Sequence, residues 1–270
     1  QSPHWSEAHA FRSKRQLERD LFPWLGARRM ADIEPVELLA TLRKVEERGA
    51  VETADRCLML ARQIWRYGVA TGRVGRDMTA DLKGALQPYR GKHFAAIIDP
   101  AEFAVLLRAI KAYRGGIVVR AALQLAPMLF QRPNELRGAT WAEMDLEAGL
   151  WTIAAQRMKR TKDGKENGQA HLVPLPAQAV QILKALKPYT ESTGLVFSGE
   201  RQRSKPISEN SVRTALISMG YTAEKQTWHG FRASARTMLA EVLNFDPLVI
   251  EAQLAHSVRD ANGRAYNRTT

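Results

Sequence analysis

Two stretches of the chain carry single basic residues at positions suited to binding a phosphate. Arg132 follows an apolar run and precedes Pro133, which opens a helix; a guanidinium and a helix N-terminus both favour an anion there. Lys159 lies where a strand enters a basic turn, from which a lysine can reach a neighbouring groove. Each also has an ordinary structural explanation, because Arg132 can pair with Glu135 and most turn lysines are solvated.

Two further stretches combine histidine with arginine or tyrosine. In "TWHGFRASARTMLAE", His229 and Arg232 are three residues apart and Arg236 follows four later, so all three share one helix face. Protonation of His229 would place its positive charge beside that of Arg232. This arrangement is reasonable if an anion lies between the two side chains. His256 ends the run "EAQLAH", where histidine ordinarily caps a helix, and Tyr266 follows ten residues later.

The order of these residues is more specific than any one of them. An arginine, a strand-borne lysine, HxxR, "LAH" and a closing "AYNR" together resemble the tyrosine recombinases, the integrase family of phages, prophages and genomic islands. The segments "RPNELRGATWAEMDLEAGLWTIAAQRMK" and "HLVPLP" look most like the prophage and genomic-island subgroup. The resemblance covers residues 98–270, and the helical part before it resembles the family's core-binding domain more weakly.

The resemblance implies an enzyme that cuts and rejoins DNA through a covalent 3′-phosphotyrosine, integrating or excising a mobile element. Tyr266 would be the nucleophile. Arg132 and Arg232 would hold the non-bridging oxygens of the scissile phosphate, since their forked donors match those oxygens. Lys159 would be the general acid that protonates the departing 5′-oxygen.

Three more residues receive roles from the resemblance. His229 would accept the tyrosine proton or hydrogen-bond the phosphate, His256 would add a phosphate contact, and Glu135 would support the first arginine. No metal or other cofactor is expected, because two arginines and a lysine supply the positive charge. The six histidines form no HxxxH pair, the chain has one cysteine, and no GxxxxGK[ST] loop for ATP is present.

The charge of the chain favours a polyanionic partner. Forty Lys and Arg against 28 Asp and Glu give a net charge of +12, divided as about +5 before residue 97 and +7 after it. A basic surface that serves only solubility is the alternative. The sequence has no apolar run approaching the ~20 residues of a membrane span and no signal peptide at its start, and the single Cys57 suits a reducing compartment. We therefore expect a cytoplasmic bacterial protein, associated with the nucleoid and bound to double-stranded DNA rather than to a membrane.

The predicted fold class is mainly α, with a small antiparallel β-sheet in the second of two domains. Residues 1–85 are expected to form a helical core-type DNA-binding domain and residues 100–270 a catalytic domain. Residues 86–99 read as a basic interdomain linker, with a surface loop inside one domain as the alternative.

Apolar spacing and breaker residues also place the individual elements. In the first domain, helices are expected over 4–26, 31–49 and 51–72. In the second, they are expected over 101–113, 116–130, 178–186, 208–220, 230–243 and 247–256. Strands are expected at 149–155 and 170–175, joined by a basic hairpin connection. The residues expected to contact DNA outside the catalytic set are Arg90, Lys92, Arg157, Arg160, Lys162 and Lys165.

Family members of this kind usually carry an arm-site domain before the core-binding domain and a docking tail after the tyrosine. Neither is recognisable here, so we expect a fragment, a trimmed chain or a natural short form. The resemblance implies a homotetramer on attachment-site DNA, weakly associated or monomeric without it, with DNA-bending accessory proteins as further partners. Two alternatives stay open: a cleavage-silent DNA-binding protein of the same fold, and a type IB topoisomerase that relaxes DNA with similar residues.

Overall fold

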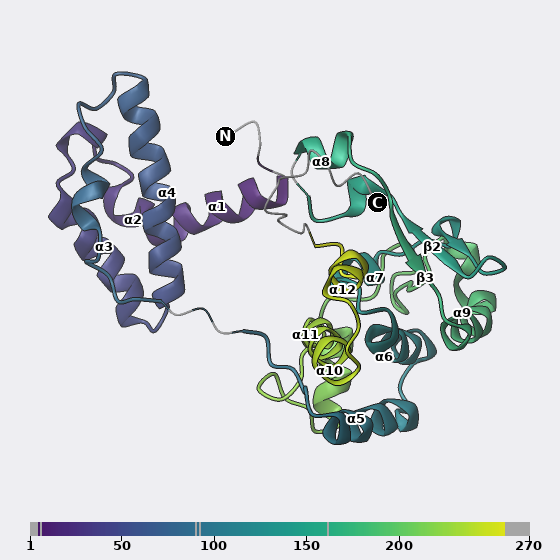
Figure 1. Ribbon diagram of the computed structural model, residues 1–270. Helices are drawn as coiled ribbons and strands as arrows, with labels where there is room; N and C mark the ends of the chain where they lie inside the picture. The colour runs from purple at the N-terminus through teal and green to yellow at the C-terminus, as the bar shows by residue number, and fades with distance from the viewer. Residues whose placement is uncertain (1–4, 6, 90, 92, 161, 257–270) are drawn as a thin grey trace. The chain divides into compact units, whose positions relative to one another are not determined.

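The computed structural model describes residues 5, 7–89, 91, 93–160 and 162–256. The chain divides into two units, Gln1–Lys92 and His93–Thr270, and Figure 1 labels their helices and strands. Each unit has its own hydrophobic core. Within the described part of the chain, no helix combines the length and the apolar character needed to cross a membrane.

The boundary between the units falls within the predicted linker of residues 86–99, between Lys92 and His93. In the first unit, the backbone N–H of Gln87 donates to Glu46 Oε1 at 2.7 Å. In the second unit, the backbone N–H of Ile97 donates to Gln226 Oε1, also at 2.7 Å. Each end of the predicted linker is therefore held by the unit next to it, because its backbone groups find hydrogen-bond partners there.

The first unit is a bundle of helices that bury their apolar faces against one another. Its elements are α1 (Glu7–Asp20), α2 (Phe22–Leu25), η1 (Met30–Asp32), α3 (Pro35–Glu47), α4 (Val51–Ala70) and η2 (Met78–Leu82). Pro35 begins α3, and Gly49, with a φ of 80°, lets the chain turn into α4. The first predicted helix is divided into α1 and α2, because Pro23 lies in the first turn of α2 and lacks the N–H needed to continue α1.

A buried carboxylate ties α1 to the end of α3. The Asp20 side chain is 0% exposed and accepts hydrogen bonds from Arg19, at 2.8 and 3.0 Å, and from Arg48. Burial raises the pKa of Asp20, but the hydrogen bonds and charges of the two arginines outweigh it and hold the pKa below its usual value. Asp20 is therefore ionised in the folded unit, paired with arginines that reach it from the surface.

The second unit consists mainly of helices, and the helices predicted for it are present. Outside the connection between its strands, the helical elements are α5 (Pro100–Ala112), α6 (Ile117–Leu129), α7 (Pro133–Arg137), η3 (Trp141–Glu143), α9 (Ala177–Thr190), η5 (Glu191–Thr193), α10 (Ser211–Ser218), α11 (Gly230–Thr237) and α12 (Pro247–Gln253). The predicted helix over 230–243 changes character part-way, because its second half, Met238–Val242 (η6), is a π-helix.

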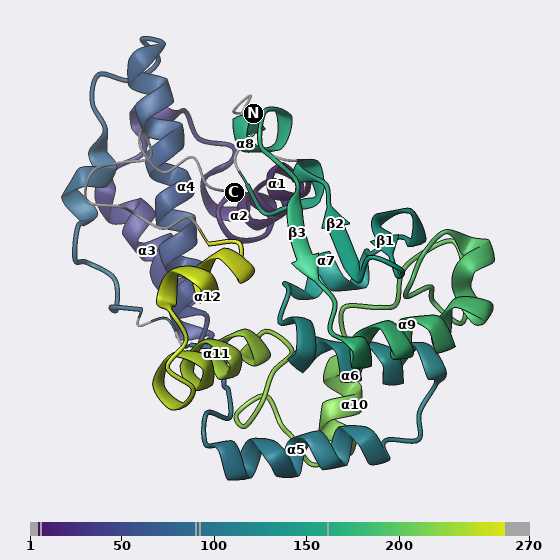
Figure 2. The ribbon, with the colours of Figure 1, turned by 45° about the vertical axis from the view of Figure 1, so that its right-hand side comes forward.

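A small antiparallel sheet completes the second unit. Figure 2 shows β1 (Met144–Asp145), β2 (Leu150–Ile153) and β3 (His171–Pro174) side by side, in the order β1-β2-β3. The two predicted strands are β2 and β3, and β1 was not foreseen. Their basic connection holds a 3₁₀ turn, η4 (Ala155–Arg157), and a short helix, α8 (Lys162–Glu166). The predicted fold class, mainly helical with a small antiparallel sheet, is confirmed.

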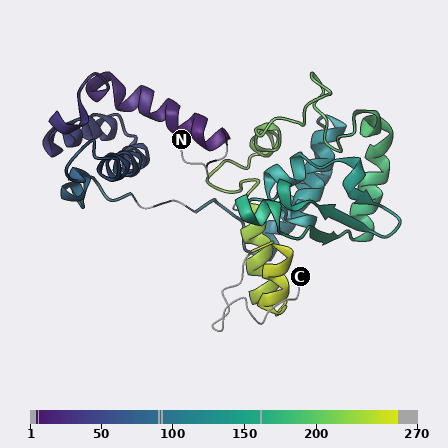
Figure 3. The ribbon, with the colours of Figure 1, turned by 90° about the horizontal axis from the view of Figure 1, so that it is seen from above.

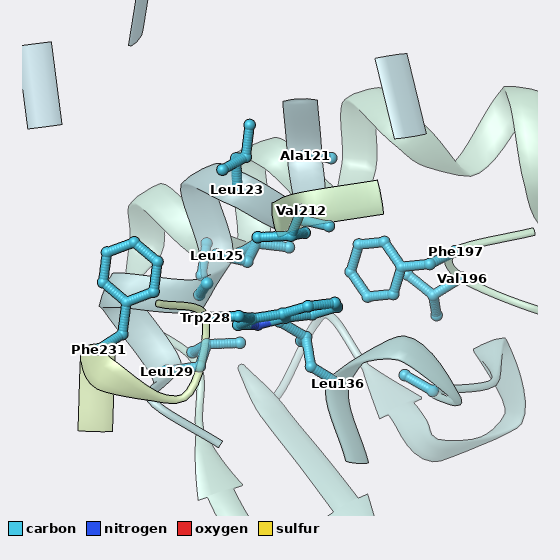
Figure 4. Packing of buried hydrophobic residues seen from close by; sticks show 14 of the residues in the cluster. Ala121, Leu123, Leu125, Leu129, Leu136, Val196, Phe197, Val212, Trp228 and Phe231 are labelled. Atoms are coloured by element: carbon cyan, nitrogen blue, oxygen red, sulfur yellow. The ribbon is translucent and has the colours of Figure 1, made fainter. Parts of the chain in front are cut away.

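The core of the second unit fixes the positions of the polar residues that lie next to core residues in the sequence. Figure 4 shows the Trp228 ring packed among apolar side chains from several elements. Those labelled around it are Leu125, Leu129, Leu136, Val196, Phe197, Val212 and Phe231. Trp228 lies directly before His229, the N-cap of α11, and Leu129 ends α6 three residues before Arg132. Packing of these neighbours therefore sets the positions of the residues that follow them.

Asp20→Asn is expected to destabilise the first unit by about 2 kcal/mol, because charge-assisted hydrogen bonds are lost. Since the folded pKa of Asp20 lies below the unfolded value, this stability is present above about pH 4 and is lost as the pH falls further. Peptide-resolved hydrogen exchange measures it, because the method reports the two units separately. Asp32→Asn is the control, since its pair with Arg29 is exposed and worth less than about 1 kcal/mol. Equal protection in Asp20→Asn and the wild type would contradict the prediction.

Candidate active site

Arg132 lies between α6 and α7, held by the glutamate three residues later. Its backbone N–H donates to Glu135 Oε2 at 3.1 Å and its Nη1 donates to Glu135 Oε1 at 2.8 Å. Glu135 is 2% exposed, so its charge is largely withdrawn from water and needs this partner. The pairing that the sequence offered as the structural explanation is present, and it fixes the guanidinium at the start of a helix.

Arg232 is a buried arginine on α11, 5% exposed. Its Nη1 donates to the carbonyl of Phe130 at 2.9 Å and its Nη2 to the carbonyl of Leu254 at 2.7 Å. Burial, followed by the nearby charge of Arg132, lowers the pKa of Arg232 to about 10. Arg232 therefore stays protonated at neutral pH, and its hydrogen bonds to the two backbone carbonyls fix the orientation of the guanidinium.

The two arginines converge on the C-terminal end of α12. Arg232 Nη2 donates to the carbonyl of Leu254, and Arg132 Nη2 donates to the carbonyl of the next residue, Ala255, at 3.2 Å. These carbonyls belong to the negative end of the helix, which favours cations. Side chains that are far apart in the sequence, one just before α7 and one on α11, thus meet at one place.

A Schellman turn gives the end of α12 its shape. The N–H of His256 bonds the carbonyl of Glu251, and the N–H of Ala255 bonds the carbonyl of Ala252, both at 2.9 Å. Ala255 has a φ of 50°, a left-handed conformation in which glycine is favoured over other residues. The turn brings His256 back towards α11, where Arg232 Nη2 lies 2.9 Å from its Nε2.

His229 and Lys159 belong to the same basic neighbourhood. Burial lowers the pKa of His229, and the charges of Arg232, Arg132, Lys159 and His256 lower it further. These electrostatic effects fall off with distance, so each of the four cationic groups is near enough to His229 to influence its pKa. Lys159 itself is exposed and follows η4 in the connection between β2 and β3.

The segment just before α5 covers the imidazole of His229. The ring of Phe94 lies 4.6 Å from the His229 ring, centroid to centroid. The carbonyl of Ala95 accepts a hydrogen bond from the N–H of Thr227 at 3.1 Å. A Cβ on Gly230 would come within 2.1 Å of this carbonyl oxygen, so a residue without a side chain is needed for the close approach.

The expected DNA contacts in the β2–β3 connection have different surroundings. Arg157 Nη1 donates to both oxygens of Glu143, at 2.6 and 2.7 Å, and its Nη2 donates to the carbonyl of Glu135 at 2.6 Å. Arg157 is thus engaged within the protein by Glu143 and Glu135, and its contact with DNA stays a prediction. Arg160 Nη1 donates to the carbonyl of Gln169 at 2.6 Å, and Lys165 is half-buried on α8.

Several predicted site residues cannot be placed. The side chain of Lys162 and the residues Arg90, Lys92 and Tyr266 lie outside the described residues. Among the residues that are described, no group of three or more His, Cys, Asp or Glu side chains could hold a metal ion.

Two side chains at the site were missed by sequence reasoning. Glu251 hydrogen-bonds His256 Nδ1 at 2.5 Å and accepts from Arg236 Nε at 2.8 Å. Gln131 Nε2 donates to the carbonyl of Gln253 at 2.8 Å, at the same end of α12. The place of Gln131 directly before Arg132 is a signal that could have been used. The sequence around Glu251 gives no such signal, since Glu251 is five residues from His256 rather than three or four.

Comparison with known proteins identifies the family. The model of the phage integrase central domain matches residues 1–85, and that of the phage integrase family matches residues 97–270. The integrase of Enterobacteria phage P4 is 34% identical, over 98% of this chain and 62% of its own length. The prophage integrase IntS of Escherichia coli (strain K12) is 32% identical, over 97% of this chain and 66% of its own length.

Solved structures give the same fold. A crystal structure of a lambda integrase dimer bound to a core site matches with a TM-score of 0.72 at 15% identity, covering 95% of this chain and 90% of that chain. The chain belongs to the phage integrase family, in the prophage subgroup of the tyrosine recombinases. It spans about two thirds of the length of the curated relatives that it matches.

Ala255→Gly is expected to stabilise the second unit by up to about 1 kcal/mol, because the left-handed conformation no longer strains a Cβ. Ala255→Val should destabilise it, since a β-branched residue fits that conformation worst. Ala252→Gly, one turn earlier in α12, is the matched control and should cost about 1 kcal/mol. Hydrogen exchange of the α12 peptides measures all three. Destabilisation of the same size by both glycine substitutions would show that Ala255 carries no strain.

Proposed function

We propose that the protein is a site-specific DNA recombinase that cleaves and rejoins DNA through a covalent 3′-phosphotyrosine formed by Tyr266. The observation that supports this most is the convergence of Arg132 and Arg232 at the end of α12. Two guanidiniums held together in a largely buried place form a site for one anion with several oxygens, such as a phosphodiester. Family membership supports the same reaction.

In this mechanism the arginines hold the non-bridging oxygens of the scissile phosphate. Their charges counter the negative charge that builds up as the phosphorus becomes pentacoordinate. Glu135 and the α12 carbonyls keep both guanidiniums oriented before DNA arrives, so little reorganisation is needed when the phosphate binds. His256 lies next to Arg232 Nη2 and helps to hold this guanidinium in place.

Proton transfer divides between His229 and Lys159. The Tyr266 oxygen attacks the phosphorus and its proton passes to His229, which is neutral at pH 7 because its pKa is lowered. The bond from phosphorus to the 5′-oxygen breaks, and that oxygen takes a proton from the Lys159 ammonium. Religation runs these steps in reverse. The phosphotyrosyl bond conserves the energy of the phosphodiester, so no external energy source is needed.

The proposal extends to the parts of the chain and their partners. The first unit would grip the core of an attachment site in double-stranded DNA, and the second would carry out the chemistry, joined through residues 86–99. A solved lambda integrase assembly is a tetramer bound to a Holliday junction, with a TM-score of 0.71 to this chain. By analogy, we propose four copies on DNA, with DNA-bending accessory proteins, acting in the nucleoid of a bacterial cell.

Tyr266→Phe is expected to abolish covalent attachment to DNA. The assay incubates the purified chain with a nicked duplex carrying the direct repeat that flanks its gene, and detects a denaturant-resistant adduct on a gel. DNA affinity of the variant should stay within about threefold, since removing one hydroxyl leaves the phosphate contacts in place. Arg232→Lys is the companion variant and should slow adduct formation roughly 100-fold or more, because lysine lacks the forked donors.

The same assay separates the alternatives. Absence of an adduct with the wild-type chain, despite tight binding, would favour a cleavage-silent DNA-binding protein. Relaxation of supercoiled DNA by the monomer, at any sequence, would favour a type IB topoisomerase. A site-dependent adduct together with strand exchange between two such sites supports the recombinase.

The pH dependence of cleavage provides a test of His229. Because the neutral imidazole is the active form, the rate at subsaturating DNA should be constant near pH 7. It should fall as the pH drops through a value below the ordinary histidine pKa of about 6.5. His229→Gln should be slower and should lose this acid limb. An unchanged acid limb in His229→Gln would assign the titration to another group.

A further inference from the structure

A continuous chain of hydrogen bonds runs through the ends of α11 and α12. Arg236 Nε donates to Glu251 Oε1 at 2.8 Å, and Glu251 Oε2 lies 2.5 Å from His256 Nδ1. On the other side of the ring, His256 Nε2 lies 2.9 Å from Arg232 Nη2. Figures 1 and 3 show the yellow-green and yellow part of the chain that contains α11 and α12, and the ion pair between Arg236 and Glu251 joins these two helices.

The chemistry of these groups determines which ring nitrogen of His256 carries hydrogen. A guanidinium has only donors, so Arg232 must donate and His256 Nε2 must accept. The hydrogen of the neutral ring is then on Nδ1, and it is donated to Glu251. The opposite tautomer would set two N–H groups against each other at the Arg232 side and leave Glu251 facing a lone pair.

Glu251 is suited to hold the ring in this state. Its side chain is 20% exposed, and burial raises its pKa. The hydrogen bonds and charges of His256 and Arg236 outweigh burial, so the pKa of Glu251 lies below its usual value and the group is ionised. His256 is 43% exposed, so one side of the ring borders solvent and packing alone does not fix its orientation.

We propose that Glu251 is a positioning residue for the recombination reaction: it holds His256 in the Nδ1–H tautomer, so that Nε2 accepts from Arg232 Nη2 and helps to orient this guanidinium for the scissile phosphate. Arg236 orients Glu251 through its other oxygen. The inference rests on the proposed function, since it gives the carboxylate a role through a histidine that accepts from the phosphate-binding Arg232. Partners of this kind commonly fix the tautomer and orientation of a functional imidazole.

The first measurement needs no DNA. In the full chain labelled with ¹⁵N at histidine, long-range ¹H–¹⁵N spectra distinguish the two tautomers, and His256→Gln identifies the His256 signals by their loss. The wild type should show Nδ1–H. Glu251→Gln should keep that tautomer, because its amide oxygen still accepts the hydrogen bond, and Glu251→Ala should lose it.

The second measurement is single-turnover formation of the Tyr266 adduct on the nicked duplex at saturating DNA. Glu251→Ala should be roughly 10- to 100-fold slower, with Glu251→Gln between it and the wild type. DNA affinity should not fall, because each variant removes a negative charge. Glu241→Gln, an exposed residue of η6, removes the same charge as a control and should cleave at the wild-type rate.

Two results would overturn the proposal: cleavage by Glu251→Ala at the wild-type rate, or an unchanged His256 tautomer in that variant. A slow Glu251→Ala that also loses the tautomer, with a normal Glu241→Gln, supports it. Should the wild type form no adduct, the proposed function fails. The spectra then still decide whether Glu251 holds the ring.

Discussion

Two guanidiniums brought close together in a mostly buried place repel each other, and this structure compensates the repulsion with the end of a helix. The carbonyls of Leu254 and Ala255 each receive one arginine donor, and Glu135 adds a full negative charge beside Arg132. Without these groups, burying both arginines would cost several kcal/mol. The second unit therefore holds its two arginines together before any phosphate is present, and their positions depend on that of α12.

Much of the fold could be predicted from local patterns. Leu38, Leu42 and Val45 lie on one stripe, and they are buried in α3 as their spacing indicates. Strands β2 and β3 follow from short runs of branched and aromatic residues between breakers, and β1, with two residues, is too short for such a signal. The kinds of residue at the site were also predictable, because the order of the motifs is characteristic of a family.

The contacts made by those residues were less predictable, because they depend on partners distant in sequence. The sequence indicated Arg157 only as one of the basic residues expected to contact DNA. Only the fold shows that Glu143, fourteen residues earlier, returns to the same place and pairs with it. The role of Glu251 depends on a turn with a left-handed residue at Ala255, where alanine gives no warning of the glycine-like conformation. Nothing in local spacing joins Arg132 to Arg232; the family resemblance supplied that connection.

The segment that covers His229 has a consequence for the behaviour of the chain between the units. Phe94 and Ala95 continue directly from the connecting residues and lie on the start of α11. Lifting this segment would expose the imidazole to water and raise its pKa, since burial is the largest cause of the present low value. Such coupling is reciprocal. Acidification should therefore weaken the attachment of this segment to α11. While the segment stays attached, it should keep the imidazole of His229 neutral and able to accept a proton.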